Sequence, residues 1–433
     1  MLRNLTYMAG ATFSRLISGA VLMVFIARVL GPEDFGHFVL VLSLAMVMAL
    51  LVEFGHANFV MRELGLQHQP ANQLLVSTLR AKGLLVLIYA VFATLAWCLG
   101  LVEPGSELGF VCLCVTAVVV TLGDFLNACF RGVQRFEIET RNVVLASVIH
   151  VLLVAPVVWY TKNWTDIAVA FLVSRGTYLI LSMVSFRSVF SGVGSALYTA
   201  GGLADAMRQI RLSLAYAADA TLVTVRSYAD VFLISTFLGV GPLGFYQAGM
   251  NLVRAIENVG PIIANVFLPK LSGLLNKPVE SARYEKQLLL LLLGCGMACF
   301  GALALLPDRF LSAIFGERYA PAFGLFPFFG LYLLARFVAM ALGVLLTARG
   351  YQAGRALAGL VSLGVLALCA WSLMPQLGVT AVAVANVVSA LVLVAWFTLR
   401  LRNGPLEIRD VISTVVVLGT LALMAHLLFG GSK

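Results

Sequence analysis

Two stretches of the sequence, 207–208 residues apart, decide the fold. The first is VFIARVLGPEDFGHF at residues 24–38, and the second is VFLISTFLGVGPLGFY at residues 231–246. Further along each copy, FVMRELG at 59–65 matches FLPKLSG at 267–273 at the same offset. Six apolar segments separate the copies, and because this number is even, both copies enter the membrane in the same direction. The pattern predicts a parallel internal repeat, an arrangement that places a substrate site between the two halves.

The composition places the chain in a lipid bilayer. Of the 433 residues, 61% are hydrophobic and only 11% are charged, and the mean hydropathy is +0.99. Soluble domains carry about 25% charged residues, with which they cover their surface. The values exclude a soluble enzyme, a disordered chain and a collagen-like rod. The apolar segments are continuous and do not alternate with polar residues, which favours helices over barrel strands and predicts an all-α polytopic membrane protein.

The net charge of +9 and the seven cysteines do not indicate a nucleic-acid, metal or cofactor site. The basic residues are scattered between apolar segments, so we expect no nucleic-acid partner. The cysteines lie inside apolar segments without metal-ligand spacing and are expected to act as small hydrophobic residues. The motif GVGPLG at 239–244 has a proline inside it and no strand before it, so we interpret it as an interhelical turn rather than a nucleotide site.

Thirteen apolar segments are long enough to span a bilayer as helices, and the pattern is compatible with twelve to fourteen spans. The expected spans are 8–29, 37–56, 80–102, 108–130, 142–160, 165–187, 212–238, 243–268, 286–306, 320–347, 353–374, 378–399 and 409–430.

The connections between the segments are short, and the two longest lie near 188–211 and 269–285. The first of them is rich in Gly, Ser and Ala, which is typical of a linker. We therefore expect an N-terminal six-helix bundle at 1–187, a cytoplasmic linker at 188–211, a C-terminal six-helix bundle at 212–400 and an extra transmembrane helix within 401–433.

Basic residues predict the orientation. If the N-terminus is cytoplasmic, 19 of the 29 Lys and Arg residues fall in cytoplasmic connections, 5 on the opposite face and 5 inside spans. Cytoplasmic loops of membrane proteins are enriched in Lys and Arg. We therefore expect a cytoplasmic N-terminus and, with thirteen spans, a periplasmic or extracellular C-terminus.

Arginines inside the expected spans are the residues most indicative of function. Arg15, Arg226, Arg254 and Arg336 lie well inside four different spans, and Arg175 lies near the middle of a fifth. A charged side chain at the centre of a bilayer costs about 2.5–3.5 kcal/mol on insertion scales, so these groups must face the bundle interior or a hydrated cavity. A guanidinium stays charged at physiological pH and binds phosphate bidentately. The pattern predicts a cavity that receives an anion.

Other polar residues share helix faces with these arginines. The further candidates for substrate binding are Gln247, Asn251, Asn258 and Tyr332. The candidates for ion coupling are the carboxylates Asp124, Asp219, Asp230 and Glu257.

A structural interpretation of the same charges stays open, because a carboxylate can simply neutralise an arginine as a buried ion pair. Asp219 or Asp230 can pair with Arg226, and Glu257 with Arg254. Arg15 and Arg336 have no acid within one turn of their own helix, which favours a role in the cavity for these two.

Motifs along the chain resemble those of a known family. They are RVLGPEDFGHF at 28–38, EFG at 53–55, REL at 62–64, DVFLI at 230–234, GFYQA at 244–248, FLPKL at 267–271 and FGERYAPA at 315–322. In this order, over about residues 1–400, they resemble the polysaccharide (O-antigen type, Wzx-like) flippases of the multidrug/oligosaccharidyl-lipid/polysaccharide exporter superfamily.

The resemblance implies two six-helix bundles that work by alternating access around a central cavity. It implies that an undecaprenyl-pyrophosphate-linked oligosaccharide, the repeat unit of an O-antigen, lipopolysaccharide or exopolysaccharide, moves from the inner to the outer leaflet of the bacterial cytoplasmic membrane. The four central arginines would then hold the pyrophosphate. Membrane lipids, a polysaccharide polymerase and a chain-length regulator are the further partners we expect. The thirteenth helix departs from the common twelve-helix core.

Two other function classes stay open. A multidrug or organic-cation antiporter of the same fold needs an excess of acids in its cavity, whereas here five span arginines face four carboxylates and the marginal Glu53. A membrane-embedded polymerase or ligase needs a catalytic loop outside the membrane, and the longest connections hold no cluster of acids and bases. We therefore expect a transporter that is not an enzyme and uses no cofactor.

Overall fold

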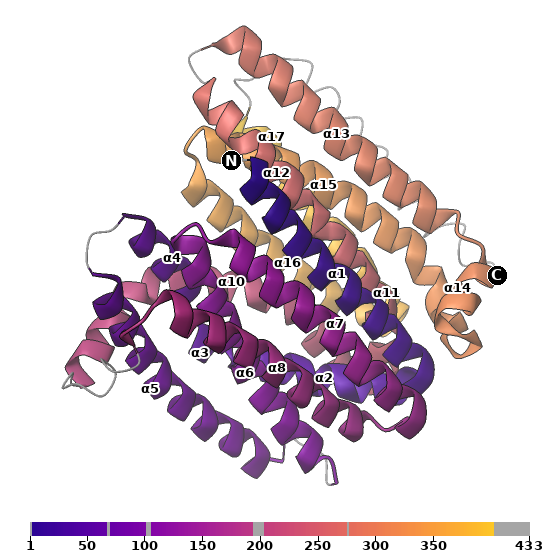
Figure 1. The fold of residues 1–433 in the computed structure, drawn as a ribbon. Coiled ribbons are helices and arrows are strands. Elements are labelled where there is room, and N and C mark those ends of the chain that lie inside the picture. Colours follow the sequence, from indigo (N-terminus) through magenta and orange to yellow (C-terminus); the bar gives the residue numbers. More distant parts are fainter. Residues whose placement is uncertain (1, 67–69, 101–104, 194–202, 275–276, 402–433) are drawn as a thin grey trace. The chain divides into compact units, whose positions relative to one another are not determined.

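The chain folds into helices joined by short turns (Figure 1). The computed structural model describes residues 2–66, 70–100, 105–193, 203–274 and 277–401, and this part of the chain contains no strand. It forms two compact units, Met1–Val231 and Phe232–Lys433. The helices of the first unit are α1 (Leu2–Leu30), α2 (Pro32–Met48), α3 (Leu50–Glu53), α4 (His56–Leu66), α5 (Ala71–Cys98), α6 (Glu107–Gly132), α7 (Phe136–Thr161), α8 (Trp164–Val189) and most of α10 (Leu203–Leu238). The helices of the second unit are α11 (Val240–Glu257), α12 (Val259–Gly273), α13 (Pro278–Ala304), α14 (Asp308–Phe315), the 3-10 helix η1 (Glu317–Leu325), α15 (Phe326–Ala348), α16 (Gln352–Leu377) and α17 (Thr380–Arg400).

Eleven helical segments in the described residues are long and apolar enough to cross a membrane, and they correspond to eleven of the expected spans. The expected span 243–268 is divided at Asn258 between α11 and α12. The expected span 409–430 lies outside the described residues. The count of thirteen spans and the boundaries of the expected bundles therefore stay predictions.

A glycine begins the second helix of each expected half. Gly31 precedes α2 with φ 87°, and Gly239 precedes α11 with φ 90°. Residues with a side chain rarely adopt such φ values, so glycine ends the preceding helix here and redirects the chain. Pro32 is then the first residue of α2, where its missing N–H costs no helical hydrogen bond. The two glycines have the spacing of the expected repeat, which itself stays a prediction.

The second span is broken near its end. Phe54 and Gly55 have φ values of 43° and 66° between α3 and α4. Glu53 Oε2 accepts a hydrogen bond from the Gly55 backbone N–H at 2.7 Å. Lys82 Nζ donates to the Val52 carbonyl at 2.7 Å. Inside a membrane each freed backbone group needs a partner within the protein, and two charged side chains supply these partners.

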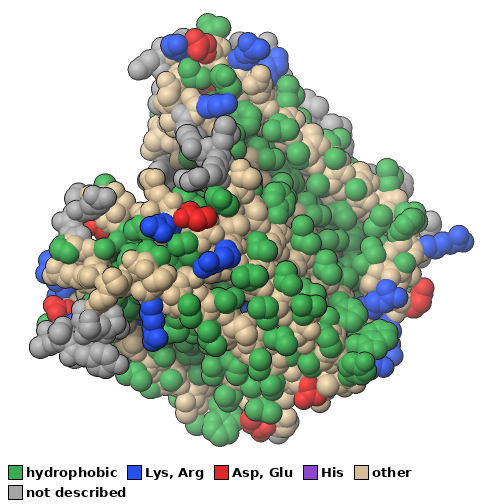
Figure 2. Space-filling model, in the orientation of Figure 1, with side chains coloured by type: hydrophobic (Ala, Val, Ile, Leu, Met, Phe, Trp, Pro, Cys, Tyr) green, Lys and Arg blue, Asp and Glu red, His purple; other side chains and the backbone are tan. Residues whose placement is uncertain are grey.

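One helix is central to each unit. In the first unit α6 packs against α2, α4 and α8, and in the second α15 packs against α12, α13 and α17. Most side chains of α15 are buried. Outer helices expose large apolar side chains, among them Leu87, Val91 and Leu152, and the face in Figure 2 is correspondingly rich in hydrophobic side chains and sparse in charges. Such a surface is the one that a lipid environment requires.

Candidate functional site

The first unit contains a cavity of about 160 Å³ between α1, α2, α6, α7 and α8. Its polar lining residues are Arg15, Thr116, Asp124, Ser147, Arg175 and Tyr178, and its other lining side chains are apolar. Two guanidinium groups and one carboxylate therefore face the same small space.

Arg15, Asp124 and Tyr178 form the centre of this site. Arg15 Nη1 lies 3.0 Å from Asp124 Oδ1. The Tyr178 hydroxyl donates to the same oxygen at 2.8 Å and accepts from Arg15 Nη2 at 3.2 Å. A glycine makes room for the ring, because a Cβ on Gly123 would lie 2.5 Å from Tyr178 Cε1. The side chains of Arg15 and Asp124 keep 45% and 37% of their surface exposed, so a solute in the cavity can reach them.

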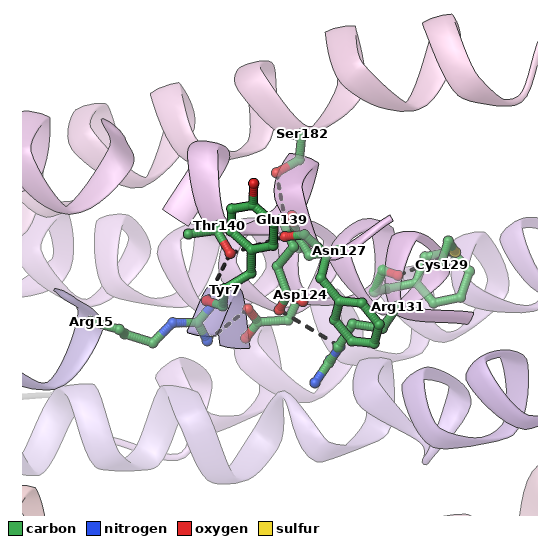
Figure 3. A network of polar contacts seen from close by, with 12 residues as sticks. Tyr7, Arg15, Asp124, Asn127, Cys129, Arg131, Glu139, Thr140 and Ser182 are labelled. Atoms are coloured by element: carbon green, nitrogen blue, oxygen red, sulfur yellow. Dashed lines mark hydrogen bonds and ion pairs between the residues drawn. The ribbon is translucent and has the colours of Figure 1, made fainter. Parts of the chain in front are cut away.

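A chain of polar contacts continues along α6, and Figure 3 shows it beside the Arg15–Asp124 pair. Asn127 Nδ2 donates to the Tyr178 hydroxyl at 3.0 Å and to Ser182 Oγ at 2.8 Å. One turn further, Arg131 Nε lies 3.6 Å from Glu139 Oε1. These contacts join α6 to α7 and α8 and hold the cavity wall in place.

We expect Tyr178→Phe to loosen this cluster while keeping the ring. The change removes a donor to Asp124 and an acceptor for Arg15 and Asn127, and the loss of a typical intramolecular hydrogen bond costs about 0.5–1.5 kcal/mol. The melting temperature of the purified full chain should fall. Tyr160→Phe, at a tyrosine that is 82% exposed, should leave it unchanged. Equal melting temperatures for the two variants would contradict the role given to the Tyr178 hydroxyl.

The second unit contains an ion pair of its own. Two nitrogen atoms of Arg336 on α15, Nε and Nη2, each lie 2.6 Å from Glu257 Oε1. The Tyr332 hydroxyl donates to the other carboxylate oxygen of Glu257 at 3.1 Å. Three of the expected site residues, from two helices, therefore meet in one cluster.

The expected polar stripe on α11 is present in the structure. Arg254 Nη1 donates to Gln247 Oε1 at 3.0 Å, two turns away on the same helix. The side-chain nitrogens of Gln247 and Asn251 are buried and have no hydrogen-bond partner among the described residues. Asn258 is exposed and donates to the Arg254 carbonyl at 2.8 Å. Buried amide groups with spare donors are typical of a site that receives water or a polar ligand.

The remaining candidates lie on α10. Arg226 is half-buried there. Asp230 is 3% exposed, and its Oδ1 accepts from the Val231 backbone N–H at 2.9 Å. The side chain of Asp219 lies outside the described part of the chain.

The observed carboxylate partners of the arginines differ from those that spacing within a single helix indicates. Arg15 and Arg336 have carboxylate partners, but the partners lie on other helices. Glu257 binds Arg336, which the sequence did not indicate as one of its partners. Tyr178, which connects Arg15 to Asp124, was not among the candidates, since a lone tyrosine in an apolar span resembles any core residue.

Comparison with known proteins covers both sequence and fold. Residues 1–275 match the family described as "Polysaccharide biosynthesis protein". A curated relative from Shigella flexneri, named "Putative O-antigen transporter", is 22% identical over 309 residues, which cover 68% of this chain and 72% of the relative.

Solved structures of transporters are similar over nearly the whole chain. The lipid II flippase MurJ in an inward closed conformation has a TM-score of 0.77 at 10% identity, covering 98% of this chain and 93% of that one. An inward-facing multidrug resistance MATE family transporter of the MOP superfamily has a TM-score of 0.67 at 15% identity, covering 93% and 95%. At these identities the likeness shows the fold, and the all-α polytopic class expected from the sequence is confirmed.

Proposed function

Because the chain belongs to the polysaccharide biosynthesis protein family, we propose that it is a flippase for a polyprenyl-pyrophosphate-linked oligosaccharide. In this function it moves the repeat unit of a polysaccharide from the inner to the outer leaflet of the bacterial cytoplasmic membrane. The observation that carries the proposal is the family match over residues 1–275, together with the likeness of 98% of the chain to a lipid II flippase.

The intramembrane arginines support an anionic cargo. Arg15, Arg226, Arg254 and Arg336 lie on four helices, α1, α10, α11 and α15, and guanidinium groups bind phosphate bidentately. In this proposal they hold the pyrophosphate, and Gln247, Asn251, Asn258 and Tyr332 offer hydrogen bonds to the sugars. The spare buried donors of Gln247 and Asn251 support the second role.

The membrane potential favours outward movement of such a cargo. With a negative cytoplasm, export of an anion gains about 2.3 kcal/mol per charge per 100 mV. Alternating access would then need a relative movement of the two expected bundles, which the expected linker at 188–211 would join. Coupling to an ion would use Asp124, Asp219, Asp230 or Glu257, of which Asp124 and Glu257 each have an arginine partner that a coupling ion has to displace.

A multidrug or organic-cation antiporter is the second candidate, and the likeness to a multidrug resistance transporter favours it. Reconstituted full-length protein separates the two candidates. A flippase transfers a fluorescent polyprenyl-pyrophosphate oligosaccharide to the opposite leaflet of liposomes and does not move a cationic dye along a proton or sodium gradient. Dye transport without lipid transfer would overturn the flippase proposal.

We expect Arg226→Ala to abolish lipid transfer while the protein still inserts normally. Arg226→Lys should retain only part of the activity, because lysine keeps the charge but loses the bidentate fork. Arg208→Ala is the matched control, since Arg208 lies on the same helix, is exposed and stands close to its start. If the Arg226→Ala variant transfers lipid at the rate of the control, Arg226 is not part of the cargo site.

A further inference from the structure

Arg175 on α8 interacts electrostatically with Asp124 but forms no direct ion pair with it. Its side chain is half-buried and lines the cavity of the first unit. Among the residues that the structure describes, none accepts a hydrogen bond from Arg175 or forms an ion pair with it. Arg15, the other guanidinium in the cavity, is bound by Asp124 and Tyr178. The cavity therefore has one positive charge in excess.

Apart from Asp124, which forms its ion pair with Arg15, the groups beside Arg175 supply no negative charge. A hydrogen bond of 2.7 Å joins His150 Nδ1 and Ser174 Oγ, and the His150 ring lies edge-on to Phe171. None of these side chains is an anion at neutral pH. A guanidinium held among apolar helices is costly unless water or an opposite charge reaches it, and the cavity is the space from which either can come.

The cavity has room for a small anion. Its volume of about 160 Å³ accommodates a halide or one phosphate group together with water. The Ser147 hydroxyl lines the same cavity and makes no hydrogen bond to any described residue. The Thr116 hydroxyl, in contrast, donates to the Cys112 carbonyl at 2.7 Å.

We propose that the first unit binds a small inorganic anion, a halide or a phosphate group, in this cavity, with Arg175 as its counter-charge and Ser147 as a neutral donor. Arg15, one of the four arginines proposed to hold the cargo, lines the same cavity, but binding of a free anion is tested without the cargo and does not depend on the proposed function. Asp124 lowers the affinity for the anion by its own negative charge, and Arg15 offsets most of that repulsion at 3.0 Å.

Anion binding is measured on the purified full chain by equilibrium dialysis with radiolabelled chloride alone and with radiolabelled inorganic phosphate alone. Sodium gluconate, a bulkier organic anion, keeps the ionic strength constant. We expect saturable binding of at least one of the two anions and a rise in melting temperature with that anion but not with gluconate. Arg175→Gln should weaken binding by roughly tenfold or more, since it removes a charged hydrogen-bond donor.

Three further variants keep the proposal falsifiable. Arg187→Gln removes the same charge from the exposed end of the same helix and should bind like the wild type. Ser147→Ala should weaken binding severalfold, and Asp124→Asn should tighten it, because it removes the one negative charge in the cavity. If Arg175→Gln does not fold, the opposite signs of Ser147→Ala and Asp124→Asn still test the site. Equal affinity of the wild type and Arg175→Gln, or binding of neither anion by folded wild type, would overturn the proposal.

A competition experiment distinguishes free anion from a lipid headgroup. Polyprenyl pyrophosphate and the uncharged polyprenol are added to the dialysis in matched amounts. Displacement of the labelled anion by the pyrophosphate lipid alone supports a site that a headgroup phosphate enters. Displacement by neither lipid supports a site for the free inorganic anion. Equal displacement by both lipids would contradict an anion site, because the polyprenol has no charge to compete with.

Discussion

Gly55→Ala is expected to remove most of the folded protein from the membrane. Gly55 has φ +66°, and a Cβ built on it would lie 2.4 Å from the Tyr216 carbonyl carbon and 2.6 Å from the Ala217 backbone nitrogen. These atoms belong to the backbone of α10 and cannot turn away as a side chain can. Overpacking of this kind costs about 1–3 kcal/mol, and a left-handed conformation costs a residue with a side chain about 1–2 kcal/mol more.

The measurement is the yield of monodisperse protein in mild detergent and its melting temperature. Gly83→Ala is the matched control, because Gly83 lies inside α5 and a Cβ there meets no atom within 4 Å. That control should be neutral or slightly stabilising, since alanine is the better helix former. A Gly55→Ala protein with the yield and melting temperature of the Gly83→Ala protein would contradict the close approach of the turn at Gly55 to α10.

Hydropathy predicts much of this fold because lipid imposes a simple rule. A span must be a continuous apolar helix, since no water is present to bind free backbone groups. Hydropathy does not predict the break in the second span at Gly55 or the division between α11 and α12 at Asn258. At Gly55 the freed backbone groups are bound by Glu53 and by Lys82, and Lys82 comes from another helix. A sequence pattern within one span contains no information about such a partner.

The candidate site, too, could be predicted from the sequence only in part. Charges inside apolar spans identify Arg15, Asp124, Glu257 and Arg336 as important, and the structure brings them together as two ion pairs. Which carboxylate contacts which arginine depends on how the helices pack, and the sequence does not reveal this packing. Helical periodicity predicts only contacts along one helix face, such as that of Arg254 with Gln247. The resemblance to polysaccharide flippases, drawn from short motifs in the right order, is confirmed by the family match.

Substitutions in the ion pair of Glu257 and Arg336 can separate effects on protein stability from effects on lipid transfer. We expect Arg336→Gln or Glu257→Gln alone to cost about 3–5 kcal/mol of stability, because each leaves a charge buried without its partner. The side chains are only 20% and 16% exposed, so water screens them little. The double variant Glu257→Gln/Arg336→Gln has two neutral amides that can bind each other, and its melting temperature should return close to that of the wild type. Lipid transfer should stay lost, because the guanidinium proposed to hold the pyrophosphate is absent.

A second ion pair in the same unit provides the control for this cycle. Arg349 Nη2 binds both carboxylate oxygens of Glu285 at 2.9 and 3.1 Å, and none of the proposed cargo residues takes part. Single substitutions of Arg349 or Glu285 by Gln should lower stability, whereas the double substitution should restore stability and transfer together. If the double variant of Glu257 and Arg336 also regains transfer, then Arg336 serves only to neutralise Glu257. The pyrophosphate would in that case have to be held by the other arginines, and because a bidentate guanidinium is hard to replace, Arg15, Arg226 and Arg254 would become the side chains on which export depends.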